Sequence, residues 1–177
     1  MKEEVSENKL KEGNISLILD SYEDIFSSFD PRHYSERALS DDFLVECKRA
    51  SAEKDEDFEL RLLVPHGKRN LNHEKEILFR LKDHFNKHFK REERKVIHTK
   101  REGIAWFLVG TVLMIIATFV SGKEEFIMKL VETMLIPAGW FMFWEGLSKV
   151  FITSRENFPD YGFYNKIKNA RVKFFSY

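Results

Sequence analysis

The hydrophobic positions along this chain change their spacing several times, and each spacing predicts a different element. Residues 14–19 (NISLIL) form a short apolar run of isoleucine and leucine, which is typical of a strand. Residues 58–64 (FELRLLV) alternate between apolar and polar, so we expect a second strand with one buried face. Ile77, Leu81 and Phe85 recur every four residues instead, which predicts an amphipathic helix that continues into the apolar segment beyond it.

Local signals place the remaining elements outside the most apolar part of the chain. Ser40 is a good helix N-cap, and Asp41 and Asp42 follow it where the helix dipole favours acids, so we expect a helix that ends by Ala52. Residues 20–30 predict an irregular segment or a short strand. The C-terminal tail predicts a helix at 161–170 and then a strand at 171–177, which we expect to join the same sheet.

Two segments are apolar enough to lie in a bilayer. Residues 104–122 contain no charge, and at ~1.5 Å per residue they span about 28 Å, close to the ~30 Å thickness of the hydrocarbon core. Residues 126–144 form a second apolar segment, with Pro137 near the middle as a candidate kink. Only a short turn separates the two, so we expect a transmembrane helical hairpin.

These elements predict an α+β fold with a small cytosolic α/β layer, built from both termini, and a two-helix transmembrane hairpin. Residues 1–13 are polar and predict a mobile segment. Residues 14–102 predict the cytosolic module with its basic amphipathic helix, and 103–151 the hairpin. Residues 152–177 predict a cytosolic tail helix and strand that pack on the module.

Charge is segregated, although the whole chain has equal numbers of acidic and basic residues. Residues 1–60 contain 17 acidic and 8 basic residues, whereas 61–102 contain 6 acidic and 13 basic ones. The basic block ends where the first apolar segment begins, so anionic lipid headgroups are a better partner than nucleic acid. The residues expected at the headgroups are Lys87, Lys90, Arg91, Arg94, Lys95, Lys100 and Arg101. By the positive-inside rule, the chain is expected in the inner (cytoplasmic) membrane with both termini cytoplasmic.

The second apolar segment carries a few charged residues. Lys129 and Glu132 lie three residues apart near its start, and Glu145 and Lys149 lie four apart near its end. The simpler interpretation is that these residues form two ion pairs at the interface, with long side chains that reach the membrane surface. The alternative is that Lys129 and Glu132 serve an ion or proton pathway, or a lock between subunits.

Few residues carry recognisable chemistry. The chain has no glycine-rich phosphate loop, no nucleophile elbow and one cysteine, so we expect no cofactor. Cys47 lies on the apolar face of its predicted helix and is expected in the core. His84 and His88 share a helix face near Asp83 and His73, but nothing at matching spacing completes a zinc site, so no metal is expected.

The densest titratable cluster lies in residues 29–43 (FDPRHYSERALSDDF). One interpretation is a loop whose side chains tie backbone groups and cap the following helix. A second is a docking site for a protein partner, and a third is an acid/base catalytic site. The candidate docking residues are Asp30, Arg32, His33, Glu36, Arg37, Asp41 and Asp42.

This segment resembles a group of uncharacterised bacterial membrane proteins with the pattern FDP-x-P-x-x-ERDL, followed by a strand, a basic helix, two spans and a short tail. The matching positions are Phe29, Asp30, Pro31, Glu36, Arg37, Leu39 and Phe43. Residues 141–147 (FMFWEGL) and 164–172 (YNKIKNARV) are also similar, whereas His33 departs from the pattern. The resemblance implies an architecture and a location, but no activity.

Three functions are therefore open. The favoured one is a non-enzymatic inner-membrane protein whose module docks a partner or forms a homo-oligomer. The second is a subunit of an oligomeric pore or transporter with Glu132 near the path, where Gly110, Ala117 and Ser121 allow close helix contact. The third is a membrane-tethered enzyme that uses residues 30–42.

Overall fold

The computed structural model describes residues 14–52, 54, 58–153 and 159–177, and the mobile segment expected at 1–13 lies outside them. The chain forms two compact units. The first comprises Met1–Lys90 and Asp160–Tyr177, and the second comprises Arg91–Pro159.

The first unit contains a three-stranded parallel sheet in the order β1 (Ile15–Ile18), β2 (Glu59–Val64) and β3 (Arg171–Ser176). Leu17 lies opposite Leu62, and Leu62 lies opposite Phe174, so the N-terminal and C-terminal strands flank the central one. The prediction that the tail strand joins the sheet is confirmed. Helices lie in both connections between neighbouring strands, as parallel pairing requires.

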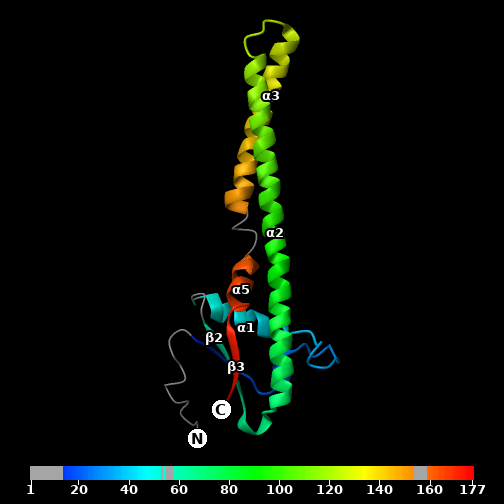
Figure 1. Cartoon of the computed structure of the whole chain (residues 1–177), viewed down its shortest axis with the longest axis vertical. Helices are drawn as coiled ribbons and strands as arrows, with labels where there is room; N and C mark the ends of the chain where they lie inside the picture. Colours follow the sequence, from blue (N-terminus) through cyan, green and yellow to red (C-terminus); the bar gives the residue numbers. More distant parts are fainter. Residues whose placement is uncertain (1–13, 53, 55–57, 154–158) are drawn as a thin grey trace. The chain divides into compact units, whose positions relative to one another are not determined.

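Three helices of the first unit cover one face of this sheet (Figure 1). They are α1 (Asp41–Ala52), the first part of α2 (Leu71–Val120) and α5 (Pro159–Ile167). Side chains two residues apart on a strand share a face, and the alternation predicted for β2 buries its apolar set here. The resulting core contains the side chains of Leu60, Leu62, Val64, Phe174, Phe43, Cys47, Ile77, Leu81, Phe85, Phe163 and Ile167. Burial raises the pKa of the Cys47 thiol to about 12, as expected of a core residue.

The opposite face of the sheet carries charged side chains from β2 and β3. The Glu59 carboxylate accepts hydrogen bonds from Lys173 Nζ at 2.6 Å and from Arg61 Nε at 2.7 Å. These bonds, that of Lys173 first, hold the pKa of Glu59 below its ordinary value. The Arg61 guanidinium also lies 5.2 Å from the centre of the Phe175 ring.

A network of hydrogen bonds joins the start of α2 to Tyr22 and to β3. Asn70 caps α2 by accepting the backbone N–H of Asn72 at 3.0 Å. One turn later, the buried Glu74 carboxylate accepts two bonds of 2.8 Å from Arg69. The same carboxylate accepts a hydrogen bond of 2.9 Å from the Tyr22 hydroxyl, and the Arg69 guanidinium also donates a hydrogen bond to the carbonyl of Phe174 in β3. The network therefore joins segments about 150 residues apart in sequence.

The second unit is a pair of long helices joined by a short turn. α2 runs without interruption from Leu71 to Val120, as the sequence predicts, and α3 spans Phe126–Ser148 before a π-helical turn at Lys149–Thr153. Gly122 sits in the connecting turn with φ of +87°, a conformation that L side chains rarely adopt. Both helices are long and apolar enough to cross a membrane.

Glycines let the two helices approach closely. The position of a Cβ atom added to Gly110 lies 2.7 Å from the carbonyl oxygen of Gly139, and one added to Gly146 lies 2.6 Å from that of Gly103. Gly103 and Gly110 are seven residues apart, as are Gly139 and Gly146. This interval keeps small residues on the facing sides of two helices that cross at a shallow angle. The buried Ala117 continues the same interval along α2.

Candidate functional site

The cluster predicted at residues 29–43 forms a loop that is closed at its base. Phe26 and Leu39 make an isolated antiparallel bridge, and the Ser27 N–H donates to the carbonyl of Ala38 at 2.9 Å. The Ser40 N–H donates to the carbonyl of Ile25 at the same distance. We call residues 27–38 the Phe29 loop. These contacts join the two ends of the loop, although it has no regular secondary structure.

Asp30 organises the inside of the Phe29 loop. Its carboxylate accepts side-chain hydrogen bonds from Arg32 at 2.7, 2.9 and 3.2 Å and a backbone hydrogen bond from the Ala38 N–H at 2.7 Å. These hydrogen bonds hold the pKa of Asp30 well below its ordinary value, and those from the Arg32 guanidinium have the largest effect. The carboxylate is thus ionised at neutral pH, and it spans the loop from residue 30 to residue 38.

Arg37 fastens the other side of the Phe29 loop. Its guanidinium donates to the carbonyl of Ser27 at 3.1 and 3.2 Å and to the carboxylate of Glu23. It also lies 5.7 Å from the centre of the Phe26 ring. The Arg80 side chain of α2 donates to the Arg37 carbonyl at 2.9 Å, so the loop is also tied to the helix.

Phe29 lies at the surface of this tied loop. Its side chain is 95% exposed, the largest exposure among the large hydrophobic side chains that the structure describes as exposed. Its backbone N–H is held by the Ser27 hydroxyl at 3.3 Å. The structure therefore presents a fully solvated aromatic ring on a backbone fixed by side-chain and backbone bonds.

The seven predicted docking residues divide into two groups. Asp30 and Arg37 face inward, with side chains only 12% and 13% exposed, and they shape the loop. Arg32, His33, Glu36, Asp41 and Asp42 are exposed, and the last two lie in the first turn of α1, where acids favour the helix. Solvent exposure of both His33 and Glu36 counts against the acid/base interpretation. The exposure of Phe29 was not predicted, because phenylalanine side chains are most often buried.

The two histidines weighed for a metal site stack on each other instead. The rings of His84 and His88 lie 4.2 Å apart and nearly parallel, and His88 stacks in turn on Tyr164 of α5. Parallel rings do not direct their nitrogen lone pairs at one ion. Within the described residues, no group of three or more His, Cys, Asp or Glu side chains is placed to hold a metal. Burial, and then His88, lower the pKa of His84 to about 4.

The basic residues expected at lipid headgroups are all exposed on α2. In the second unit, Arg91, Arg94 and Arg101 recur at intervals of three and seven, which keeps them on one side of the helix. Val96 and Glu92 are buried on another side of the helix. The Glu92 carboxylate forms an ion pair of 2.7 Å with Lys95. The first unit contributes Lys87 and Lys90, and Lys100 is exposed as well.

The charged residues of the second apolar helix do not pair as their spacing suggests. The Lys149 Nζ lies 3.6 Å from the Glu102 carboxylate on α2 and 5.3 Å from the centre of the Trp106 ring. Within the part of the chain that the structure describes, no ion pair joins Lys149 to Glu145. Among the described residues, no ion pair joins Lys129 to Glu132. Glu132 instead lines a groove between α2 and α3.

Comparisons of this chain with protein-family models, with curated proteins and with solved structures found no match. The function of the chain is therefore inferred from its own residues and geometry.

Proposed function

We propose that this chain is a non-enzymatic, two-span membrane protein whose first unit binds a protein partner through the Phe29 loop. The hairpin of α2 and α3 anchors it in the inner membrane, with both termini on the cytoplasmic side. The single observation that carries the docking role is the fully exposed Phe29 ring on an internally bonded loop.

The anchoring role is supported by where the apolar side chains of the second unit lie. Only 17% of the most apolar window of α2 and 6% of that of α3 are buried inside the structure. A core helix of a water-soluble protein buries most of such a window, whereas a helix in lipid leaves it facing outward. The exposed set includes Leu108, Val112, Ile115, Phe119, Ile127, Met134 and Phe141.

The orientation is supported by the charges that flank the helix pair. Arg91, Arg94 and Arg101 precede the apolar part of α2, whereas the turn between the helices has Lys123 beside Glu124 and Glu125. Basic residues are retained on the cytoplasmic side during insertion. The same residues would attract anionic headgroups, each by about 1 kcal/mol.

The docking role is supported by the energetics of exposed aromatic rings. Burial of a phenylalanine ring in a partner's pocket removes a large apolar area from water, and aromatic anchors dominate many interfaces. Because the loop is already fixed by Asp30 and Arg37, it loses little conformational entropy on binding. The exposed charges of Arg32 and Glu36 on the same loop suit a polar rim around such an anchor.

Site-specific photo-crosslinking in intact cells tests this proposal. A photo-reactive phenylalanine analogue is placed at position 29, and in a separate variant at Phe79, which is 71% exposed on α2 outside the loop. We expect a discrete crosslinked protein at position 29 that is absent at position 79. Arg37→Ala should abolish that adduct without removing the chain from the membrane. Identical adducts at both positions, or none at position 29, would refute docking through this loop.

A further inference from the structure

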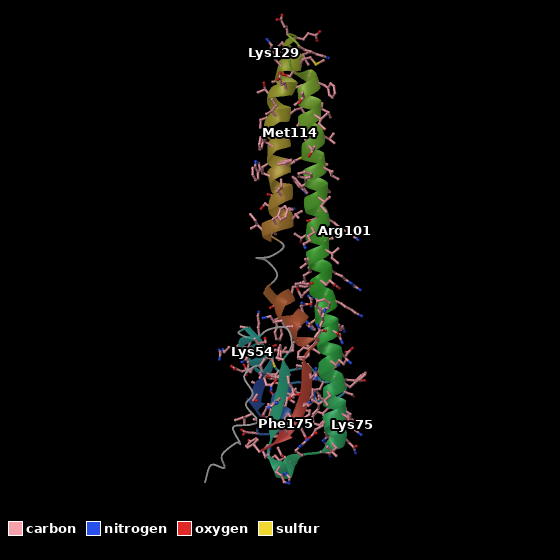
Figure 2. All side chains as sticks on the ribbon, turned by 60° about the vertical axis from the view of Figure 1, so that its left-hand side comes forward. Lys54, Lys75, Arg101, Met114, Lys129 and Phe175 are labelled. Carbon is pink, nitrogen blue, oxygen red and sulfur yellow. The ribbon has the colours of Figure 1, made fainter. Side chains whose placement is uncertain are left out.

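The second unit contains a groove between α2 and α3 that the docking proposal does not use. It has a volume of about 300 Å³, near the lower end of the range for small-molecule sites. Its walls come from both helices: Met114, Ala117, Thr118 and Ser121 of α2, and Glu132, Ile136 and Trp140 of α3. Figure 2 shows Met114 within the paired part of the helices, with Lys129 nearer to the connecting turn.

The groove follows from the small residues that bring the helices together. Gly110 and Gly139 allow backbone contact at one level. One heptad farther toward the turn, Ala117 faces the part of α3 that carries Glu132, since Glu132 precedes Gly139 by seven residues. A carboxylate therefore stands at a position of the seam where glycine stands elsewhere.

Glu132 has no counter-charge among the residues that the structure describes. Among the described residues, no ion pair or hydrogen bond is made by its carboxylate, although Lys129 lies only three residues away. Lys129 is exposed and does not line the groove. The other residues that line the groove carry no charge, and a carboxylate at such a position attracts a cationic group.

We propose that this groove binds an amphipathic organic cation, with its ammonium or phosphonium centre beside Glu132 and its apolar body along Ile136 and Trp140. Glu132, Ile136 and Trp140 follow one another at intervals of four, so they line one side of α3 over about 12 Å. The indole ring of Trp140 attracts a cation or an aromatic body through its face. The hydroxyls of Thr118 and Ser121 provide acceptors for N–H groups near the carboxylate. This inference does not depend on docking through the Phe29 loop.

Equilibrium binding to the full chain in nanodiscs of phosphatidylglycerol tests the proposal. Tetraphenylphosphonium is the probe, and triphenylphosphine oxide is its neutral analogue with a similar apolar body. We expect saturable binding of the cation and at least tenfold weaker binding of the neutral analogue. Glu132→Gln should weaken cation binding at least tenfold, and Trp140→Leu several-fold.

Matched variants separate the site from general effects. Glu125→Gln removes an exposed carboxylate near the turn and should leave binding unchanged, and Glu132→Asp should retain part of it. Equal elution volumes and thermal transitions of wild type and Glu132→Gln would show that the helix pair is intact. Equal cation affinity of these two proteins, or equal affinity for the charged and neutral probes, would overturn the proposal.

A second arm identifies the source of the cation. Phosphatidylethanolamine is added to the nanodiscs, and loss of tetraphenylphosphonium binding would assign the groove to an ammonium lipid headgroup. Unchanged binding would assign it to a free lipophilic cation.

Discussion

Substitution of Gly110 by alanine should weaken the pairing of α2 and α3. The added Cβ would lie 2.5 Å from the backbone nitrogen of Phe143 and 2.7 Å from the carbonyl oxygen of Gly139, whereas ordinary contacts begin at 3.4 Å. Both clashing atoms belong to the backbone, so no rotamer change relieves them and the helices must separate by nearly 1 Å. Overpacking of this kind costs about 1–3 kcal/mol, and we expect about 2 kcal/mol here.

The assay is a denaturation of the full chain with SDS in mixed micelles, followed by tryptophan fluorescence. Trp106 lies on α2 and Trp140 and Trp144 on α3, so the signal reports on the second unit. Gly162→Ala is the matched control, because nothing lies within 4 Å of a Cβ at that position in α5. A Gly110→Ala transition within about 0.5 kcal/mol of wild type, or equal to that of Gly162→Ala, would refute the close approach of the helices.

Two further predictions concern the first unit. In the folded protein the pKa of His84 is about 4, below the ordinary 6.5, so as the pH falls the unfolded chain binds this proton before the folded chain does. The free energy of unfolding should therefore fall by at most about 3 kcal/mol as the pH drops from 6.5 to 4. Thermal unfolding of the full chain in mild detergent at pH 7.5 and 4.5 should therefore show a smaller loss for His84→Phe than for wild type, and equal losses would contradict this. Glu74→Gln should cost about 3 kcal/mol, because the charge of Arg69 loses its buried partner, whereas Tyr22→Phe should cost about 1 kcal/mol. Denaturant unfolding measures both, and equal effects of the two changes would rule out the ion pair as the main contribution.

The local spacing of apolar residues was enough to predict most elements of the first unit. Alternation over residues 58–64 predicts β2, and the spacing of Ile77, Leu81 and Phe85 predicts the buried face of α2; both are confirmed. The parallel direction of the strands was not predictable, because it depends on contacts between residues far apart in the chain. The hydrogen bonds that join Tyr22 to Glu74 and Arg69 to Phe174 were missed for the same reason.

The candidate sites show where residue type is an incomplete guide. Asp30 and Arg37 look like surface charges in the sequence, yet backbone carbonyl and N–H groups of their own loop draw them inward. Lys149 is placed four residues from Glu145 but pairs with Glu102, because the helix pair offers a second carboxylate. The glycine seam follows an interval of seven residues. Close helix contact was predicted at Gly110, Ala117 and Ser121, but not at Gly103, Gly139 or Gly146.

Accessibility of single cysteines in intact cells tests the proposed membrane topology most directly. In a Cys47→Ser background, one variant carries Lys123→Cys in the turn between the helices, and a second carries Lys82→Cys on the exposed side of α2 in the first unit. We predict that a membrane-impermeant maleimide labels position 123 in cells with a permeable outer envelope. Position 82 should react only after the inner membrane is disrupted, and both proteins should resist extraction with alkaline carbonate. Equal labelling of the two positions in intact cells, or release by carbonate, would contradict a two-span anchor with the first unit inside.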